Sequence, residues 1–151
     1  MSGKTIRYTF LCLIWVCLTC NLTGCNDEDS IEIFVGRTWK ISNLFDAQGK
    51  PLEPDEGKIV GDNNDAFYLK FETATTFVGK TREKNFSGTW SVNLKNHQIE
   101  LTFKNTGNPT DALSKQVVTS LQRVDKYDGT YTYLKLEESD SPAYILFRPL
   151  N

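Results

Sequence analysis

Cysteine is scarce in this chain of 151 residues, and its four copies are unevenly placed. Cys12, Cys17 and Cys20 lie in an apolar stretch near the N-terminus, Cys25 follows that stretch, and no cysteine occurs later. If the stretch is removed as a secretion signal, one cysteine remains, which excludes an internal disulfide and a cysteine-rich zinc site. The fold must therefore rest on hydrophobic burial, for which eight of the nine Phe and five of the six Tyr remain as large side chains.

Basic residues and histidine are also in short supply. Without the first 24 residues the chain has 15 Lys and Arg against 19 Asp and Glu, a formal charge of −4. A nucleic-acid-binding surface needs clustered basic residues that displace phosphate counterions, so we exclude nucleic acid as a partner. The only histidine, His97, lies among turn residues and is expected to be solvated. A Ser-His-Asp or Cys-His group cannot be built around it, and we expect no enzyme, no metal and no cofactor.

The apolar run near the N-terminus, about residues 10–22, is too short for a transmembrane helix, which needs roughly 20 apolar residues. Lys4 and Arg7 precede this run, and the sequence Leu-Thr-Gly-Cys ends it at Cys25. A positive start, a short apolar run and small residues before a cysteine are typical of a lipoprotein signal. We therefore predict a signal peptide over residues 1–24 and lipidation of Cys25, which would attach the mature chain to a bacterial membrane.

A short acidic run, Asn-Asp-Glu-Asp-Ser, follows at residues 26–30. It resembles the signal by which some bacteria export lipoproteins to the cell surface, so we expect an outer-membrane lipoprotein exposed to the outside. A periplasm-facing position, with the run acting only as a solvated tether, is the alternative. We expect the tether to cover residues 25–33 and a single domain to cover residues 34–151.

Alternation of apolar and polar residues dominates the predicted domain and indicates strands with one buried face. Trp39 and Ile41 share a face just after Gly36. Three further sets alternate in the same way: Phe67, Leu69 and Phe71; Trp90, Val92 and Leu94; Ile99, Leu101 and Phe103. Strands are also expected over residues 75–79, as a hairpin with the strand before it, and near residues 130–137 and 143–148.

One segment late in the chain has helical spacing instead. Asn108 is the expected N-cap, Pro109 suits the first helical position, and Asp111 complements the helix N-terminus. The stripe that follows consists of Leu113, Val117, Leu121 and Val124. We therefore predict a mostly β fold, an antiparallel barrel or curled sheet with a single late helix.

Two groups of aromatic residues are candidates for ligand contact. Asp128 and Gly129 are expected to form a two-residue hairpin turn. Tyr131 and Tyr133 would then share one face of a strand, with Tyr127 across the turn, as a surface for a glycan or a partner protein or as simple sheet cover. If the barrel is hollow, an interior pocket for a small apolar ligand would be lined by Phe67, Phe71, Trp90 and Phe103.

Two motifs that suggest chemistry are rejected. Residues 74–81 match a relaxed phosphate-loop pattern, but they are β-branched and lack a following helix, so a hairpin is expected. Residues 61–65 offer oxygen ligands for calcium, yet they lack the glycine and the distal glutamate of an EF-hand loop. We interpret them as part of a long irregular segment that continues to Asp65.

The chain resembles the META or HslJ-like domain of bacterial envelope lipoproteins. Three stretches carry this resemblance: Gly36 to Ile41, Phe86 to Val92 and Leu113 to Leu136. This resemblance implies a non-enzymatic module for interactions in the envelope or for stress tolerance. The chain also resembles lipocalins, in which an early Gly and Trp lie at the barrel base beneath a late Arg, here Gly36, Trp39 and Arg148. That resemblance implies a carrier of a small apolar ligand, and a surface glycan-binding accessory is the third alternative.

Overall fold

The computed structural model describes residues 31–52 and 65–150. Cys25, the acidic run and most of the candidate calcium loop lie outside these residues. The described part contains eight strands, one α-helix and one 3-10 turn. They are the turn η2 (Ile31–Ile33), β1 (Thr38–Phe45), β2 (Tyr68–Phe71), β3 (Thr76–Lys80), β4 (Asn85–Asn93), β5 (Gln98–Asn105), α3 (Ala112–Leu121), β6 (Lys126–Gly129), β7 (Leu134–Glu138) and β8 (Ser141–Pro149).

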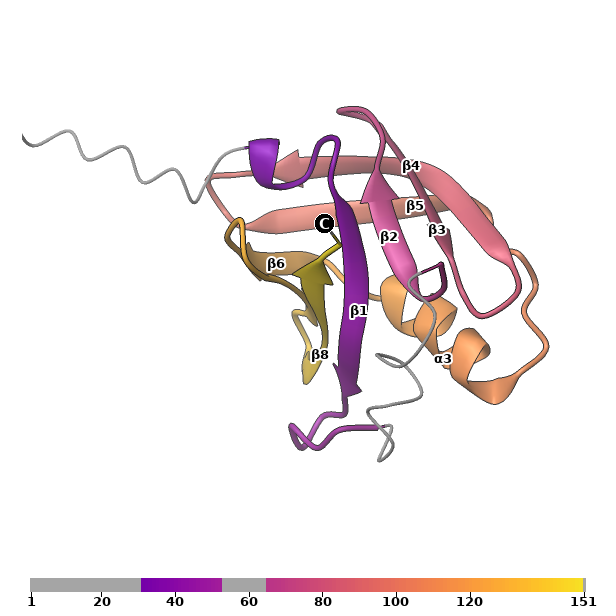
Figure 1. The fold of residues 1–151 in the computed structure, drawn as a ribbon. Coiled ribbons are helices and arrows are strands. Elements are labelled where there is room, and N and C mark those ends of the chain that lie inside the picture. The colour runs from indigo at the N-terminus through magenta and orange to yellow at the C-terminus, as the bar shows by residue number, and fades with distance from the viewer. Residues whose placement is uncertain (1–30, 53–64, 151) are drawn as a thin grey trace, which may run out of the picture.

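The eight strands form an antiparallel ring in sequence order, which confirms the predicted fold class. Each strand pairs with the next, and β8 pairs with β1 to close the ring (Figure 1). The ring is not a regular barrel, because β5 and β6 share only the pair Gln98↔Lys126. Beyond that pair the two strands separate, and α3, which connects them in the chain, lies at the lower end of the ring in Figure 1.

The inner face of the ring is aromatic and aliphatic, as the alternation predicted. Trp39, Ile41, Leu69 and Phe71 are fully buried, and the same holds for Phe77 on β3. Their polar neighbours on β2 and β3 are only partly buried, which is the period-two pattern of strands with one face toward a core. A bulge after Ile41 shifts the register of β1 against β8, so that Leu44 returns to the inner face.

The segment before β1 enters this core. Residues 31–33, which the sequence assigned to the tether, form η2, and Ile33 is fully buried. Phe34 lies among three aromatic rings. The centroid of its ring is 5.1 Å from that of Phe71, 5.2 Å from that of Trp90 and 5.0 Å from that of Tyr127. The packed domain therefore includes the residues that directly follow the acidic run.

The predicted helix exists, but it begins later than expected. Its N-cap is Asp111 rather than Asn108, since the Asp111 carboxylate accepts a hydrogen bond from the Ser114 backbone N–H at 2.9 Å. Asn108 instead has a φ of 45°, in the left-handed region. Val117 and Leu121 of the predicted stripe are fully buried, Leu113 packs against the core, and Val124 is buried just after the helix.

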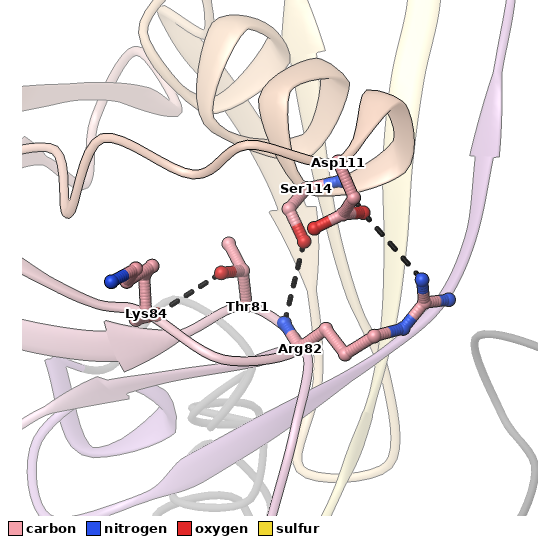
Figure 2. Close-up of polar contacts among 5 residues, drawn as sticks. All are labelled: Thr81, Arg82, Lys84, Asp111 and Ser114. Carbon is pink, nitrogen blue, oxygen red and sulfur yellow. Dashed lines mark hydrogen bonds and ion pairs between the residues drawn. The ribbon is translucent and has the colours of Figure 1, made fainter.

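The turn between β3 and β4 is fastened to the start of α3, as Figure 2 shows. The backbone N–H of Arg82 donates to Ser114 Oγ at 3.4 Å, and its guanidinium lies 3.7 Å from the Asp111 carboxylate. The turn itself is closed by the buried Thr81, whose hydroxyl donates to the Lys84 carbonyl at 3.1 Å. Burial acts to raise the pKa of Asp111, but hydrogen bonds from Ser114 and the charge of Arg82 outweigh it, so the pKa lies below its usual value.

The last hairpin turns three residues later than predicted. Lys126–Gly129 is strand β6, Gly129 pairs with Leu134, and the Thr130 N–H donates to the Tyr133 carbonyl at 2.9 Å. Tyr131 and Thr132 therefore form the turn in place of Asp128 and Gly129. The physical reason is the inner face: this register places Tyr127 opposite Leu136, and both side chains are buried.

The arginine over Trp39 is also not the predicted one. Arg148 pairs with Lys40 across β1 and β8 and is exposed, whereas Trp39 points into the core. Arg37 supplies the cation instead, with its guanidinium carbon 6.0 Å from the Trp39 ring. The lipocalin-like arrangement of Gly36, Trp39 and Arg148 was therefore wrong in its third member.

We predict that Asp111→Ala lowers the free energy of unfolding by about 1 kcal/mol at pH 7, because the N-cap is lost. A carboxylate with a lowered folded-state pKa stabilises above its unfolded pKa of about 3.9, and that stabilisation is lost as the pH falls through the folded value. Urea unfolding should show that the difference in free energy of unfolding between the variant and the wild type is smaller near pH 3 than at pH 7. Asp111→Asn, which keeps a capping oxygen, and the exposed Asp140→Asn are controls. If Asp111→Ala lowers the free energy of unfolding equally at both pH values, the ionised Asp111 carboxylate does not stabilise the helix.

Gly88 on β4 lets the Thr102 carbonyl and the Phe77 ring approach the backbone more closely than a residue with a side chain would permit. A Cβ there would lie 2.1 Å from the Thr102 carbonyl oxygen and 2.8 Å from the Phe77 ring. We predict that Gly88→Ala destabilises the fold by roughly 1 to 3 kcal/mol, because the core must shift to admit the methyl group. Ser91→Ala, an exposed position on the same strand, should unfold at nearly the wild-type urea concentration. Equal midpoints for both variants would show that Phe77 does not pack on Gly88.

Candidate functional site: the groove beside α3

A groove with a volume of about 400 Å³ lies between α3 and the adjoining ends of β1, β7 and β8. We call it the α3 groove. The sheet and its turns contribute Phe45, Asp46, Ala47, Leu52, Glu138, Ser141 and Ala143, and the helix side contributes Lys115, Gln116, Thr119, Ser120 and Arg123. The volume lies within the range of about 300–1,000 Å³ that is usual for small-molecule sites.

Phe45, the aromatic residue on the sheet side of the α3 groove, is part of a stacked pair of rings. The Phe45 and Tyr144 rings are stacked, with centroids 4.3 Å apart and planes inclined by 13°. The Lys135 Nζ lies 4.5 Å from the Tyr144 ring centroid and forms an ion pair with Glu137. The hydrogen bond within this ion pair raises the pKa of Lys135. Tyr144 is therefore in contact with both Phe45 and a cation, which supports Phe45 at the groove wall.

The turn after β1 fixes the position of the groove rim. The Asp46 Oδ1 accepts hydrogen bonds from the backbone N–H groups of Gln48 and Lys50, both at 2.9 Å. The Leu52 N–H donates to the Leu44 carbonyl at 2.8 Å, which brings Leu52 beside the end of β1. Leu52 is one of the few large apolar side chains that remain exposed among the described residues. The rim thus has an apolar edge held by backbone hydrogen bonds.

The helix side of the groove is polar, because the opposite side of α3 faces the core. Ser114, Val117, Val118 and Leu121 are the buried residues of the helix. The residues that line the groove carry two cations, Lys115 and Arg123, and these balance the two anions of the sheet side. Hydroxyl and amide groups lie between them, so the surface offers both donors and acceptors without an excess of either charge.

A second hollow of about 390 Å³ lies at the junction of β4, β5 and the residues before β6. It is lined by Glu100 and Asp125 together with small polar and aliphatic residues, and no aromatic ring contributes to it. Among the residues that the structure describes, no group of three His, Cys, Asp or Glu side chains could hold a metal ion. The α3 groove is therefore better equipped for binding than this second hollow, because it has an aromatic ring in its lining.

The three tyrosines of the sequence hypothesis are separated by the fold. Tyr127 is buried, stacks on His97 at 5.2 Å and contacts Phe34. Tyr131 and Tyr133 are half-buried in the turn after β6, where their hydroxyls donate to Glu32 and Asp128 at 3.2 and 3.1 Å. Tyr127 therefore does not join the other two at one surface.

The four side chains of the predicted interior pocket are all in or against the core. Phe71 and Trp90 pack together with centroids 4.5 Å apart, whereas Phe103 packs on Phe77 at 5.2 Å. Phe67 is buried just before β2 with a φ of 54°, and the Arg82 guanidinium lies over its ring. The structure thus distributes these side chains over separate ring contacts instead of one common wall.

The remaining candidate segments have ordinary structural roles where they are described. His97 is an exposed turn residue before β5, as expected. Residues 76–80 are strand β3, which pairs antiparallel with β2, so the predicted hairpin with the preceding strand is confirmed. Of the candidate calcium loop, only Asp65 is described, and it is exposed.

Lys40 is a buried cation that the sequence did not predict. It points away from Trp39 on the outer face of β1, is almost fully buried, and donates from Nζ to the Ala66 carbonyl. Burial, together with the charge of Arg148, lowers the pKa of Lys40, and the Asp65 carboxylate acts in the opposite direction. The contact ties β1 to the segment before β2. An alternating Thr-Trp-Lys-Ile pattern predicts a solvated lysine, so no local signal could have revealed it.

Comparisons with solved structures confirm the fold. A crystal structure of a DUF4847 family protein from Bacteroides vulgatus is 23% identical, covers 78% of this chain and 94% of its own, and has a TM-score of 0.65. The NMR structure of a protein from Burkholderia xenovorans is 13% identical, covers 80% and 86% respectively, and has a TM-score of 0.60. At these identities the likeness concerns the fold alone.

The family comparison corrects the resemblances drawn from the sequence. The expected META or HslJ-like membership and the weaker lipocalin resemblance were both wrong, because loose Gly and Trp motifs recur in many antiparallel sheets. No curated protein matches the chain. The model of a domain of unknown function, DUF4847, matches residues 26–149, and the chain belongs to that family.

Proposed function

We propose that this protein is a lipoprotein, anchored at Cys25, that acts as a non-enzymatic binding module and presents the α3 groove away from the membrane. The observation that supports the proposal most directly is the position of the groove relative to the tether. The tether enters the domain before the start of β1, and the groove lies at the end of β1.

The entry point of the tether is fixed by contacts across the chain. Phe34 is buried among three aromatic rings, and the Trp39 indole N–H donates to the Ile33 carbonyl at 3.1 Å. The Tyr131 hydroxyl donates to Glu32, and the Arg37 guanidinium lies 4.6 Å from the Tyr131 ring and donates to its carbonyl. These contacts make residues 31–37 part of the rigid domain.

Strand β1 separates the two ends of the domain. Its eight residues span about 25 Å at the usual rise of a strand, from Thr38 near η2 to Phe45 in the groove wall (Figure 1). Five residues lie between Cys25 and Ile31, and an extended chain of that length reaches about 20 Å. The tether end is therefore held close to the bilayer, and the groove faces outward.

The groove supports binding more than catalysis. Its lining residues include no histidine and no cysteine, and the Asp46 carboxylate is used by the turn after β1. Glu138 is then the one remaining carboxylate of the lining, without a second acid–base group placed beside it. Among the described residues, no helix is long and apolar enough to cross a membrane.

The anchor is tested with Cys25→Ala in the producing bacterium. The wild-type chain should fractionate with the membrane and yield an acylated N-terminal peptide by mass spectrometry, because several acyl chains on one residue give stable attachment. The variant should lose the acyl mass and leave the membrane fraction. An unmodified Cys25 in wild-type material would refute the anchor.

Exposure to the outside is tested by labelling with a membrane-impermeant maleimide. The mature chain has no other cysteine, so Asp140→Cys places a single free thiol on the exposed turn between β7 and β8. Labelling in intact cells is expected if residues 26–30 direct surface export, and replacing their acidic residues by Ala should abolish it. Labelling only after lysis would instead place the domain in the periplasm.

A further inference from the structure

We infer that the α3 groove binds a neutral carbohydrate chain, an inference that rests on the proposed binding role of this groove. The first support is the aromatic wall. The polarised C–H groups on one face of a sugar ring are attracted to the electron-rich face of an aromatic ring. Phe45 lines the groove while one of its faces is stacked on Tyr144, so the sheet side combines a supported ring with the apolar Leu52 and Ala143.

The second support is the mixture of hydrogen-bonding groups opposite this wall. Each sugar hydroxyl donates one hydrogen bond and accepts others, so a sugar site needs both kinds of group close together. Gln116 provides a carbonyl and an amide, Thr119 and Ser120 provide hydroxyls, and Arg123 provides several donors. Glu138 on the sheet side adds an acceptor.

The third support is the charge and shape of the groove. Two cations and two anions line it, which gives no net attraction for a strongly anionic ligand. A carrier site for an apolar molecule would be mainly hydrophobic, whereas this lining alternates apolar and polar groups. A volume of about 400 Å³ suits a short stretch of a chain whose ends extend into solvent.

The experiment is a titration of the mature, lipidated chain in nanodiscs with defined probes. The neutral probes are gluco-, manno-, xylo- and N-acetylglucosamine oligosaccharides, and the anionic probes are oligogalacturonate and a heparin fragment. Binding is followed by ¹⁵N NMR and calorimetry. At least one neutral probe should shift the amide signals of Phe45, Thr119 and Ser141, with a Kd between about 1 μM and 1 mM.

Variants separate the groove from the rest of the surface. Phe45→Ala should weaken binding of that probe by about tenfold or more, since it removes the stacking surface. Gln116→Ala and Thr119→Val alter partly or fully exposed helix positions, should leave the fold intact, and should each weaken binding by about threefold or more. Tyr133→Ala, in the turn after β6, is the matched aromatic control and should bind as wild type.

Three results would overturn the carbohydrate assignment: no neutral probe shifts groove signals at about 10 mM, only anionic probes bind, or the shifts map to Tyr131 and Tyr133. A soluble envelope protein that shifts the groove signals while all sugars fail would keep the proposed binding role and reject its ligand. Acylation of Cys25 and maleimide labelling at position 140 are measured on the same variants. They report the anchor and the exposure independently of any sugar.

Discussion

Phe34 is fully buried inside the ring and joins the segment before β1 to the aromatic core. One aromatic side chain, contributed by the segment between η2 and β1, touches rings from β2, β4 and β6. Burying such a side chain stabilises a fold by about 1.5–3 kcal/mol, and here it also fixes where the chain enters the domain. The interior at this end is filled by protein side chains.

The incomplete pairing of β5 and β6 accounts for the other end of the domain. Once the two strands separate after Gln98, the core must be covered by something else, and α3 supplies Val117, Val118 and Leu121 for that purpose. A helix beside the ends of strands cannot pack against them as closely as another hydrogen-bonded strand would. The polar side of the helix and the ends of β1 and β8 therefore enclose the α3 groove.

Much of the fold follows from the sequence, because alternation directly reports one buried face. Trp39 and Ile41, or Leu69 and Phe71, could be assigned to the core from spacing alone. The turn at Tyr131 and the cap at Asp111 were missed because a strong local signal, Asp-Gly or Asn-Pro, was outweighed by burial of Tyr127 and by the contact of Ser114 with Arg82. The groove was not predicted at all, since Phe45, Gln116 and Glu138 come from separate elements that only the closed ring brings together.

Paramagnetic relaxation measures whether residues 31–37 lie next to the membrane and the α3 groove lies away from it, as we propose. The lipidated chain is placed in nanodiscs whose lipid headgroups carry a spin label, and the loss of amide signal is measured along the chain. We expect the largest losses at residues 31–37 and 130–133 and little loss at Phe45, Thr119 and Ser141. Losses at the groove that equal or exceed those beside η2 would refute this orientation of the domain.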